Sequence, residues 1–387
     1  MKQGGTNPSP LYPNRRLSST LSEIMHDPES RGAAEAVVRQ DWPEGGLESV
    51  DECPVCGSTR RRALYVGLRD NIFFCAPGEW ALHDCLDCGS AYLDPRPSAA
   101  TLHLAYRRYY THDEPESRPA ANLRGLRYLR RLLINGYKNW RFCAKLEPAS
   151  PLGVPLVFLL PFIRTATEHA FRHLPRTAQH GRLLDIGFGS GAFLDAARAI
   201  GWEVSGVDPD SQSVSNALKR GLNVYQGDLA VLAGESNAFD VITLSHVIEH
   251  VHKPIPVLEA CHRLLKPGGM LCLETPNIRS LGRERFQNNW RGLETPRHLV
   301  IFNRRSLHTA LKQVGFTGVR DVSRPNPCFF IYASSQRMKH GLDPYANLPV
   351  PAWLKAEIIA TGLLESCLRS RREYVSVTAR KPKEPGA

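Results

Sequence analysis

Residues 181–194, GRLLDIGFGSGAFL, constrain the fold more strongly than any other stretch of the chain. The apolar run before the glycines predicts a short buried strand, and the residues after them have helical spacing. Between them, Gly187, Gly189 and Gly191 form a tight turn, where glycine reaches positive φ and lets a ligand touch the backbone. The first N–H groups of the following helix face whatever polar group lies in that turn. The stretch therefore predicts a strand, a glycine loop and a helix that together cradle a ligand.

Two details indicate which ligand the loop holds. Its spacing is G-x-G-x-G, whereas a pyrophosphate-binding turn has G-x-G-x-x-G. The strand also ends in Asp185, whose charge would repel a pyrophosphate and attract the ammonium of an amino-acid group. These residues resemble motif I of the class I S-adenosylmethionine-dependent methyltransferases, in which the acid lies beside the methionine part of the cofactor. The alternative is a structural glycine turn in another doubly wound protein.

Further acids follow at the ends of the next two predicted strands. Residues 202–210 predict a second strand that ends in Asp208, about twenty residues beyond the loop, where an acid accepts hydrogen bonds from ribose hydroxyls. This position suits a nicotinamide cofactor as well as adenosylmethionine. Residues 223–230 predict a third strand that ends in Asp228 and Leu229. By the same resemblance, Asp228 contacts the adenine amino group and Leu229 packs beside the ring. Apart from the resemblance, a Gly-Asp turn indicates only a loop.

The stretch FDVITLSHVIEHV predicts the fourth strand and its exit. Ser245 and His246 come at the carboxyl end of this strand, where ligands bind in open α/β sheets, and Glu249 and His250 follow on the next turn. The stretch resembles the exit motif of the ubiquinone-type methyltransferases and their relatives. The motif LLKPGG comes next, and we expect its KPGG turn to reverse the chain before a fifth strand, MLCLETPN.

Residues 286–316 resemble the segment that covers the substrate pocket in a widely spread branch of these enzymes. This cover segment carries four residues that match the pattern: Trp290, Pro296, His298 and Phe302. Its end, SLHTALKQVGF, predicts the helix before the sixth strand. Residues 373–381 alternate as a last strand does, and the resemblance places that strand antiparallel to the others.

Two Cys-x-x-Cys pairs, each followed by Gly-Ser, lie ahead of this region. They comprise Cys53, Cys56, Cys85 and Cys88. A two-residue gap lets both sulfurs of a pair face one ion, and four thiolates make a closed tetrahedral site that suits structural zinc. The pairs lie farther apart than in most zinc ribbons, so we expect a hairpin with a loop at 64–74 between them. The module resembles the zinc-binding module found ahead of some methyltransferase domains; redox pairs are the alternative.

The chain of 387 residues exceeds one average domain, and we divide it into four parts. These are a mostly disordered segment at 1–50 with a helical candidate at 33–39, a zinc ribbon at 51–93, a helical linker or cap at 94–180, and a methyltransferase domain at 181–387 with an insertion at 325–372. The expected fold class is α/β, a Rossmann-like seven-stranded class I methyltransferase sheet with a small N-terminal zinc ribbon. We expect a helix at 352–369 in the insertion, which could be a pocket wall, a dimer contact or a membrane contact.

The charge of the chain suggests anionic partners without choosing among them. Its net charge of +11 favours nucleic acid, an acidic membrane surface or phosphorylated substrates. The first residues lack the apolar core of a signal peptide, and no apolar run reaches the length of a membrane span. With ten cysteines, expected to be reduced, the chain is predicted to be cytoplasmic, with a peripheral contact at the inner membrane face left open.

Three segments between the cysteines and the glycine loop have helical or apolar patterns. Residues 94–110 predict a short helix that docks the ribbon. Residues 123–145 alternate Arg and Lys with Leu, Tyr and Trp, and residues 151–163 are apolar but broken by proline. A basic amphipathic helix next to an apolar segment is what an interfacial membrane contact needs. The alternative, which we favour at this point, is a connecting helix that caps the catalytic domain and exposes its arginines to water.

Methyl transfer from a sulfonium is an in-line displacement, so alignment of donor and acceptor does most of the catalysis, with a base where the acceptor carries a proton. The candidate bases are His298, His250 and His246, since histidine titrates near neutrality. Each could instead be a buried structural residue. In the small-RNA 2′-O-methyltransferases, a Glu-x-x-Glu-His stretch and a distant histidine hold a divalent ion. Glu249, His250 and His298 match that set here, but His246 replaces its first glutamate.

The resemblance implies S-adenosyl-L-methionine as cofactor, and the cysteines imply structural Zn²⁺. The expected reaction is O-methylation of a glycan, a lipid-linked molecule or a secondary metabolite. An RNA methyltransferase, favoured by the charge and the ribbon, is the nearest alternative. A non-catalytic cofactor-binding protein and an NAD-dependent dehydrogenase are the others. The oligomeric state stays open.

Overall fold

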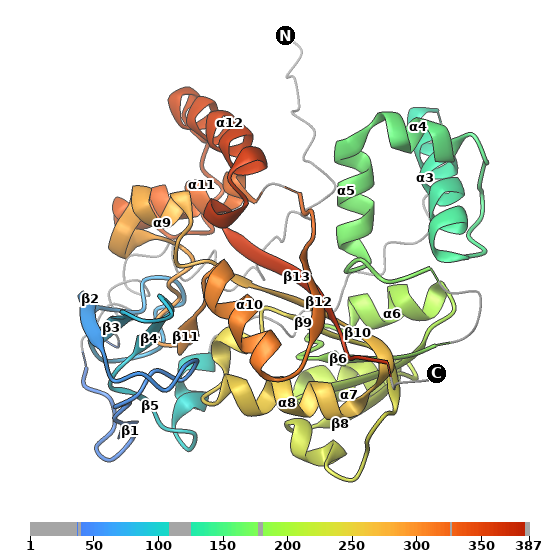
Figure 1. Ribbon diagram of the computed structural model, residues 1–387. Coiled ribbons are helices and arrows are strands. Elements are labelled where there is room, and N and C mark those ends of the chain that lie inside the picture. Colours follow the sequence, from blue (N-terminus) through green and yellow to red (C-terminus); the bar gives the residue numbers. More distant parts are fainter. Residues whose placement is uncertain (1–36, 38–39, 108–124, 177–180, 326, 384–387) are drawn as a thin grey trace.

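The structure of the protein is a computed structural model, which describes residues 37, 40–107, 125–176, 181–325 and 327–383 (Figure 1). A seven-stranded sheet with helices on both faces forms the larger part. A four-stranded sheet packs beside it, and two groups of helices project from one end. The predicted α/β class is confirmed.

The seven-stranded sheet has the order β12-β13-β10-β9-β6-β7-β8. Its central strands pair in parallel, whereas β13 runs antiparallel to both of its neighbours. The predicted sheet, including its antiparallel last strand, is therefore confirmed. The strands are β6 (Arg182–Ile186), β7 (Glu203–Asp208), β8 (Asn223–Gln226), β9 (Phe239–Ser245), β10 (Leu265–Pro276), β12 (Thr317–Asp321) and β13 (Tyr374–Arg380).

Neighbouring residues of each central strand belong to different cores, as the period of two in a strand requires. Leu183 and Val241 pack with helices α6 and α7, whereas Leu184 and Ile242 pack with α8 and α10 on the other face. Both faces are covered, so these strands carry continuous apolar runs. The four helices are α6 (Ala192–Ala199), α7 (Ser211–Lys219), α8 (Pro254–Leu264) and α10 (Arg304–Gln313).

The cysteine pairs lie in the four-stranded sheet, whose order is β11-β4-β3-β2. The predicted hairpin joins them as β2 and β3, although its loop runs from 69 to 79 and not from 64 to 74. Strand β11 comes from the cover segment, so the ribbon and the larger part of the molecule share one sheet. The strands are β2 (Arg61–Leu68), β3 (Trp80–Cys85), β4 (Ala91–Leu93) and β11 (Val300–Ile301), and a separate pair is formed by β1 (Leu47–Glu48) and β5 (Arg96–Pro97).

The residues just before the ribbon are more ordered than the composition of 1–50 indicates. Trp42 and Val50 are buried in the ribbon core, and the Trp42 ring meets that of Trp80 edge to face at 5.2 Å. Aromatic burial thus fixes residues 40–50, which we expected to be loosely attached. The helical candidate at 33–39 lies outside the described residues except for residue 37.

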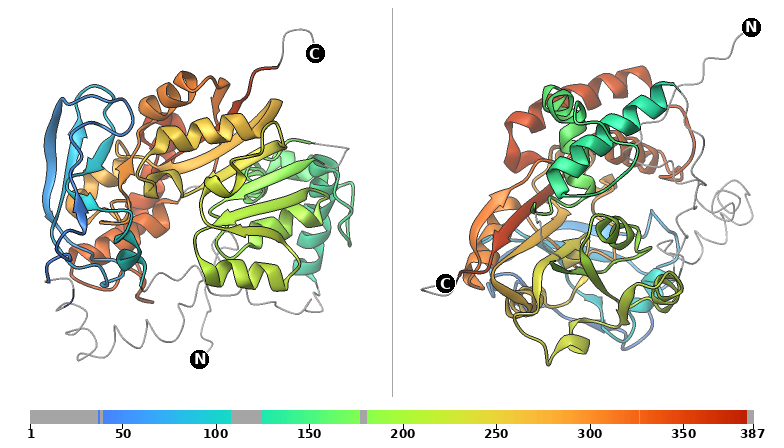
Figure 2. Two further views of the ribbon diagram at one scale, coloured as in Figure 1. Left: turned by 90° about the horizontal axis from the view of Figure 1, so that it is seen from below. Right: turned by 90° about the vertical axis from the view of Figure 1, so that its right-hand side faces the viewer.

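Three helices form a unit ahead of β6. Two helices of the insertion pack together with a third from outside it (Figure 2). In the first unit, Gly136 and Gly153 let α3 and α4 touch, since a Cβ on either would lie within 2 Å of a backbone oxygen of the other segment. The helices are α3 (Leu126–Phe142), α4 (Gly153–Leu159), α5 (Pro161–Ala170), α9 (Leu281–Phe286), α11 (Cys328–Lys339) and α12 (Ala352–Cys367). Short 3-10 helices are η1 (Leu102–Tyr106), η2 (Leu229–Leu232), η3 (Ile248–His250), η4 (Gln287–Asn289) and η5 (Arg369–Arg371).

Further local predictions were wrong. The helix predicted for 94–110 is replaced, in its described part, by β5 and the 3-10 helix η1. The third strand ends at Gln226, and Asp228 instead caps η2 by accepting a hydrogen bond from the Ala230 N–H at 2.8 Å. A short acidic side chain favours such a cap over a continued strand. The KPGG residues lie within β10, where they form an irregularity between Leu265 and Met270. The helix predicted for 352–369 is present as α12, whereas α11 was not predicted.

Within the described residues, each helix is either too short or too polar to cross a lipid bilayer.

A buried ion pair joins the ribbon to the cover segment. The Asp70 carboxylate accepts hydrogen bonds from two nitrogens of Arg297, at 2.7 and 3.1 Å, and both side chains are fully buried. Asp70 also accepts from the backbone N–H groups of its own loop, those of Ile72, Phe73, Cys75 and Ala76. The pair therefore fixes the ribbon loop and the cover segment against each other.

We predict that Asp70→Asn lowers the free energy of unfolding by about 3–5 kcal/mol, because it removes the hydrogen-bonded counter-charge of buried Arg297 and leaves only the Glu294 carboxylate, 3.7 Å away and shared with Arg291. The matched control is Glu79→Gln in the adjacent exposed pair with Arg69, whose side chains are 58% and 44% exposed. This change should cost less than about 1 kcal/mol. Urea unfolding followed by tryptophan fluorescence measures both. Equal losses of unfolding free energy in the two variants would contradict the role of the buried pair in joining the ribbon to the cover segment.

Candidate active site at the carboxyl edge of the sheet

Three of the predicted cofactor residues gather at one edge of the seven-stranded sheet. Strands β6, β7, β9 and β10 run parallel, so Asp185, Asp208 and Ser245 come at the carboxyl ends of the first three, and Glu274, which was not predicted, at that of β10. This edge is where open α/β sheets bind ligands. The structure thus brings together residues that lie far apart in the sequence.

The glycine loop has the geometry that its sequence predicts. Gly187, Gly189 and Gly191 have φ of 66°, 55° and 71°. A Cβ on Gly187 would lie 2.5 Å from a methyl group of Val247, so this position excludes any side chain. The Gly189 N–H donates to Asp208 Oδ2 at 2.8 Å, which ties the loop to the end of β7. The conformation of the loop is therefore fixed by its glycine backbone and by one carboxylate.

Asp185 lies at the base of the loop and is fully buried. Its Oδ1 accepts from Thr243 Oγ1 at 2.7 Å and from the Arg172 guanidinium, whereas its Oδ2 has no hydrogen-bond partner among the described residues. Burial raises the pKa of the Asp185 carboxyl, and Arg172 and Thr243 oppose that rise. A buried oxygen without a partner indicates that a donor is missing. Arg172, which stacks on Phe193 at 4.0 Å, was not identified from the sequence.

The remaining cofactor candidates surround this loop at different depths. Asp208 is nearly buried and also accepts from the Asp210 N–H at 2.9 Å. Asp228 is exposed and Leu229 is half-buried, both at the start of η2, beyond the end of β8. Ser245 is half-buried opposite Glu274 in the register of β9 and β10.

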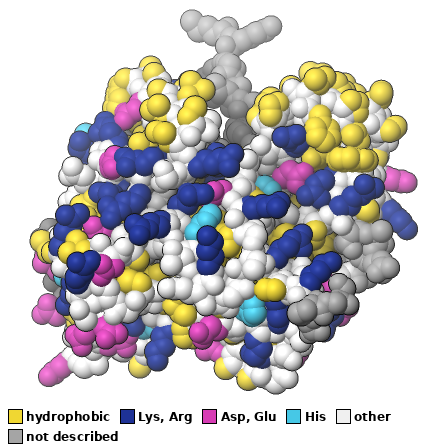
Figure 3. Space-filling view, in the orientation of Figure 1, with side chains coloured by type: hydrophobic (Ala, Val, Ile, Leu, Met, Phe, Trp, Pro, Cys, Tyr) yellow, Lys and Arg dark blue, Asp and Glu magenta, His cyan; other side chains and the backbone are white. Residues whose placement is uncertain are grey.

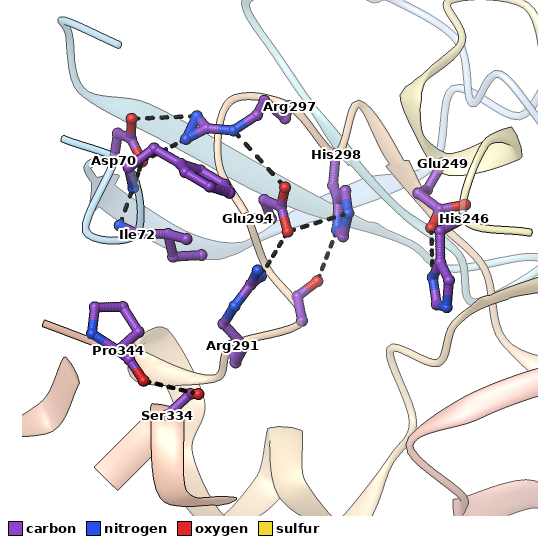
Figure 4. Close-up of polar contacts among 12 residues, drawn as sticks. Asp70, Ile72, His246, Glu249, Arg291, Glu294, Arg297, His298, Ser334 and Pro344 are labelled. Atoms are coloured by element: carbon purple, nitrogen blue, oxygen red, sulfur yellow. Dashed lines mark hydrogen bonds and ion pairs between the residues drawn. The ribbon is translucent and has the colours of Figure 1, made fainter. Parts of the chain in front are cut away.

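His246 lies between the carboxylates of Glu249, shown beside it in Figure 4, and Glu274. Its Nδ1 is 3.2 Å from Glu249 Oε1 and its Nε2 is 3.3 Å from Glu274 Oε1. Burial favours the neutral ring, but the hydrogen bonds to Glu249 and then to Glu274 outweigh it and raise the pKa of His246 to about 9. The ring is therefore charged at neutral pH, and it is a poor general base.

Glu274 is the centre of a charged network that sequence reasoning missed. It contacts His169 of α5 at 3.1 Å, His246, Arg324 at 3.2 Å and the hydroxyl of Ser376. Burial would raise the pKa of Glu274, but Arg324 and the two histidines hold it well below its ordinary value. An acid at the carboxyl end of an apolar strand was the available signal. The network joins α5 and β13 to the edge of the sheet.

The other two histidines face each other, with ring centroids 4.7 Å apart. His298 Nδ1 lies 2.8 Å from the Gly292 carbonyl oxygen, and His250 Nδ1 lies 3.1 Å from that of Arg297. Carbonyl oxygens only accept, so His298 Nδ1 donates to Gly292, whereas His250 Nδ1 also lies 3.0 Å from the Tyr106 hydroxyl, which can donate or accept. Burial lowers the pKa of His298 to about 4, so this ring is neutral.

Glu249 completes a group of possible metal ligands with these rings. It is fully buried, and one ligand atom from each of Glu249, His250 and His298 lies within 4.8 Å of the other two. Metal-binding histidines commonly donate their second ring nitrogen to a carbonyl, as His298 does here to Gly292. The three residues thus fit a divalent ion, whereas His246 pairs with Glu249 at its side.

The cover segment is enclosed by protein. Trp290, Pro296, His298 and Phe302 are all buried, because β11 pairs with ribbon strand β4. Figure 4 shows His298 beside Glu294, whose carboxylate also pairs with Arg291. His298 is therefore enclosed behind the carboxyl edge, at the junction between the ribbon and the sheet.

The four ribbon cysteines also meet as predicted. Cys53 and Cys88 have sulfurs 3.7 Å apart, those of Cys56 and Cys85 are 3.6 Å apart, and all four form one cluster. Zinc–sulfur bonds of about 2.3 Å in a tetrahedron require sulfurs about 3.8 Å apart, so the cluster fits a zinc ion.

Comparison with known proteins adds the family. Residues 162–321 match the family model described as "Methyltransferase domain". The chain contains a class I S-adenosylmethionine-dependent methyltransferase domain. The match begins inside α5 and ends at the last residue of β12, so it includes the glycine loop, the β9 exit and the cover segment.

Relatives of this methyltransferase domain share only part of their length with the chain. A ubiquinone biosynthesis O-methyltransferase of Burkholderia pseudomallei is 33% identical over 130 residues, which are 32% of this chain and 54% of that protein. One from Cereibacter sphaeroides is 38% identical over 102 residues, 25% of this chain and 41% of that protein. A methyltransferase structure from Archaeoglobus fulgidus has 20% identity and a TM-score of 0.38, and covers 58% of this chain and 94% of its own; we draw nothing from so low a score.

Glu373 fixes the cover segment of the methyltransferase domain from the other side. It is fully buried, and its carboxylate accepts from the Gly282 N–H at 2.7 Å and from Trp290 Nε1 at 2.8 Å. Burial, followed by the nearby Glu365 carboxylate, raises the pKa of Glu373 to about 8. Glu373 thus joins α9, α12 and the cover segment to the start of β13.

We predict that Glu373 makes stability depend on pH. Since its folded pKa lies above the ordinary 4.5, its contribution is fully present below pH 4.5 and is lost as the pH rises through about 8. Melting temperatures of the wild type should therefore fall across this window relative to those of Glu373→Gln. Glu203→Gln, at a side chain that is 64% exposed, is the control and should follow the wild type. Parallel curves for all three proteins would contradict the raised pKa.

Proposed function

We propose that the chain transfers a methyl group from S-adenosyl-L-methionine to a hydroxyl oxygen of its acceptor. One observation carries the proposal: the unpartnered Oδ2 of buried Asp185 lies at the base of a glycine loop that excludes side chains. An ammonium group would supply the donor that this oxygen lacks. Arg172, on the other oxygen, provides a positive charge suited to the carboxylate of the same amino-acid group.

The other predicted cofactor residues would contact the remaining parts of the cofactor. In this proposal Asp208 accepts hydrogen bonds from the ribose hydroxyls, Asp228 and Leu229 contact the adenine, and Ser245 borders the sulfonium end. The bound cofactor would supply an electrophilic methyl group. The protein's task is then to align the acceptor and to exclude water.

The structure changes which residues are proposed to assist the acceptor. His246 is already protonated between Glu249 and Glu274, so we assign it to positioning and not to proton removal. His250 and His298 each offer a ring nitrogen within 4.8 Å of a Glu249 carboxylate oxygen. We propose that these three residues hold a divalent ion, which would supply a Lewis acid for a hydroxyl group.

The acceptor is proposed to be a glycan, a lipid-linked molecule or a secondary metabolite. The named relatives support O-methylation, but they share less than two thirds of their length with this chain. We propose that zinc in the ribbon is structural, because four thiolates leave it no open position. Its contribution would be to hold β4, on which the cover segment pairs through β11.

We predict that Gly187→Ala weakens binding of S-adenosyl-L-methionine at least about tenfold, because its Cβ would meet Val247 and narrow the loop. The matched control is Gly221→Ala, which has a similar φ of +69° but no atom within 4 Å of its new Cβ. Both should lose stability, Gly187→Ala more because of its contact with Val247, and only Gly187→Ala should lose affinity. Calorimetric titration measures the binding. No heat with the folded wild type would overturn the proposed function, and equal affinities would overturn the loop assignment.

We predict two divalent-ion sites per chain, one in the ribbon and one at Glu249. Glu249→Gln should remove one ion and Cys56→Ser the other, as measured by elemental analysis of protein loaded with Zn²⁺ or Mn²⁺ and then desalted. Glu259→Gln, at an exposed residue of α8, is the control and should retain both. Retention of both ions by Glu249→Gln would refute the second site.

A further inference from the structure

Two apolar surfaces project from the same end of the molecule. The first is the α4–α5 tip, residues 151–163, and the second is the α12 face, formed by Ala356, Ile359, Ala360, Leu363 and Leu364. Figures 1 and 2 place both at one end of the molecule in perpendicular views. Figure 3 shows hydrophobic side chains gathered at both projections.

The α4–α5 tip has no charged side chain and is poorly covered. Leu152, Leu159 and Phe162 are 65%, 75% and 66% exposed, and Phe158 is 45% exposed. Val157 is the large apolar residue of α4 that does face the protein. Contact of these apolar side chains with water is unfavourable, so we expect another apolar surface to cover the tip.

The residues of the α12 face recur at helical spacing on the side of α12 that faces solvent. Ile359, Leu363 and Leu364 are 66%, 68% and 52% exposed, whereas Leu354 and Ile358 on the opposite side are buried. The helix is therefore apolar on its outer side as well as against α11. Its charged side chains are Lys355, Glu357 and the buried Glu365, none of which belongs to the α12 face, and an exposed apolar face of this kind marks an interaction site.

Both surfaces arise from the edge of the sheet that holds the candidate active site. Helix α5 reaches this edge through His169, which contacts Glu274, and is followed by Arg172, which contacts Asp185. Helix α12 leads into β13, whose first residue, Tyr374, pairs with Pro276 at the end of β10. A flat apolar phase touching both surfaces would therefore face that edge.

Basic side chains lie behind the apolar surfaces. In Figure 3, Lys and Arg spread across the visible face below both projections. Helix α3 exposes Arg127, Arg130 and Arg131 beside the α4–α5 tip. At the base of α12, Arg369 is exposed and Arg372 is half-buried, in a crevice that also holds the Arg304–Asp321 ion pair. Apolar side chains in front of arginines match the order of acyl chains and anionic headgroups in a bilayer.

We propose that the α4–α5 tip and the α12 face insert together into the surface of an anionic phospholipid bilayer, and that this contact brings the carboxyl edge of the sheet to the lipid headgroups. A second copy of the chain fits less well, because the arginines behind each surface would meet like charges across a two-fold contact. The proposal deepens the proposed function by selecting acceptors anchored in, or dissolved in, the membrane. Docking itself does not depend on catalysis.

The test is co-sedimentation of the full chain with vesicles of phosphatidylcholine alone or mixed with phosphatidylglycerol. We expect binding to the mixed vesicles that weakens as salt rises, and at least about tenfold weaker binding for Leu159→Ser/Phe162→Ser and for Ile359→Ser/Leu363→Ser. The matched control is Leu218→Ser/Val231→Ser, at residues that are 54% and 46% exposed in α7 and η2, which should bind as the wild type does.

Two further measurements separate the outcomes. Calorimetry with S-adenosyl-L-methionine should give the wild-type affinity for all three double variants, so loss of vesicle binding is distinct from failure of the cofactor site. Light scattering after size exclusion reports the oligomeric state. The proposal is overturned if the wild type ignores anionic vesicles, if the tip variants bind them as the control does, or if those variants only convert a dimer to a monomer.

Discussion

The fully buried pair of Asp70 and Arg297 is the contact on which the relation between the two halves of the molecule depends. Asp70 organises its own ribbon loop through backbone N–H groups, and Arg297 belongs to the cover segment next to His298. Neither charge could be buried alone, because an isolated charge in a protein interior is strongly unfavourable. The ribbon and the methyltransferase sheet are consequently parts of one structure, with β11 as a strand in common.

A second set of charges governs the carboxyl edge of the sheet. Glu274 and Glu249 keep His246 protonated. Glu274 also contacts His169 of α5 and Arg324, which lies ahead of α11. The same carboxylate therefore positions a site residue and the bases of both projecting helical units. This arrangement explains how a membrane contact at the α4–α5 tip and the α12 face would fix the orientation of the site.

The sequence predicted the parts of the fold that have local signals. Periodicity and glycine placement gave the seven strands and the loop at Gly187, and the paired Cys-x-x-Cys spacing gave the four-sulfur cluster. It did not predict α11, the end of β8 or the burial of Trp42, since each depends on which partner a segment finds. The same holds for Arg172, whose contact with Asp185 follows from a turn after α5 and not from any motif.

The sequence by itself determined the class of the sheet, the order of its loop, acids and exit motif, and the residue types that can bind a cofactor or zinc. Only the tertiary structure decided how the histidines are used: His246 is charged between two carboxylates, whereas His298 is neutral because it is enclosed by the ribbon. The physical reason is that periodicity and turn chemistry act along the chain. Charge state and exposure are set instead by neighbours that the fold brings from distant segments.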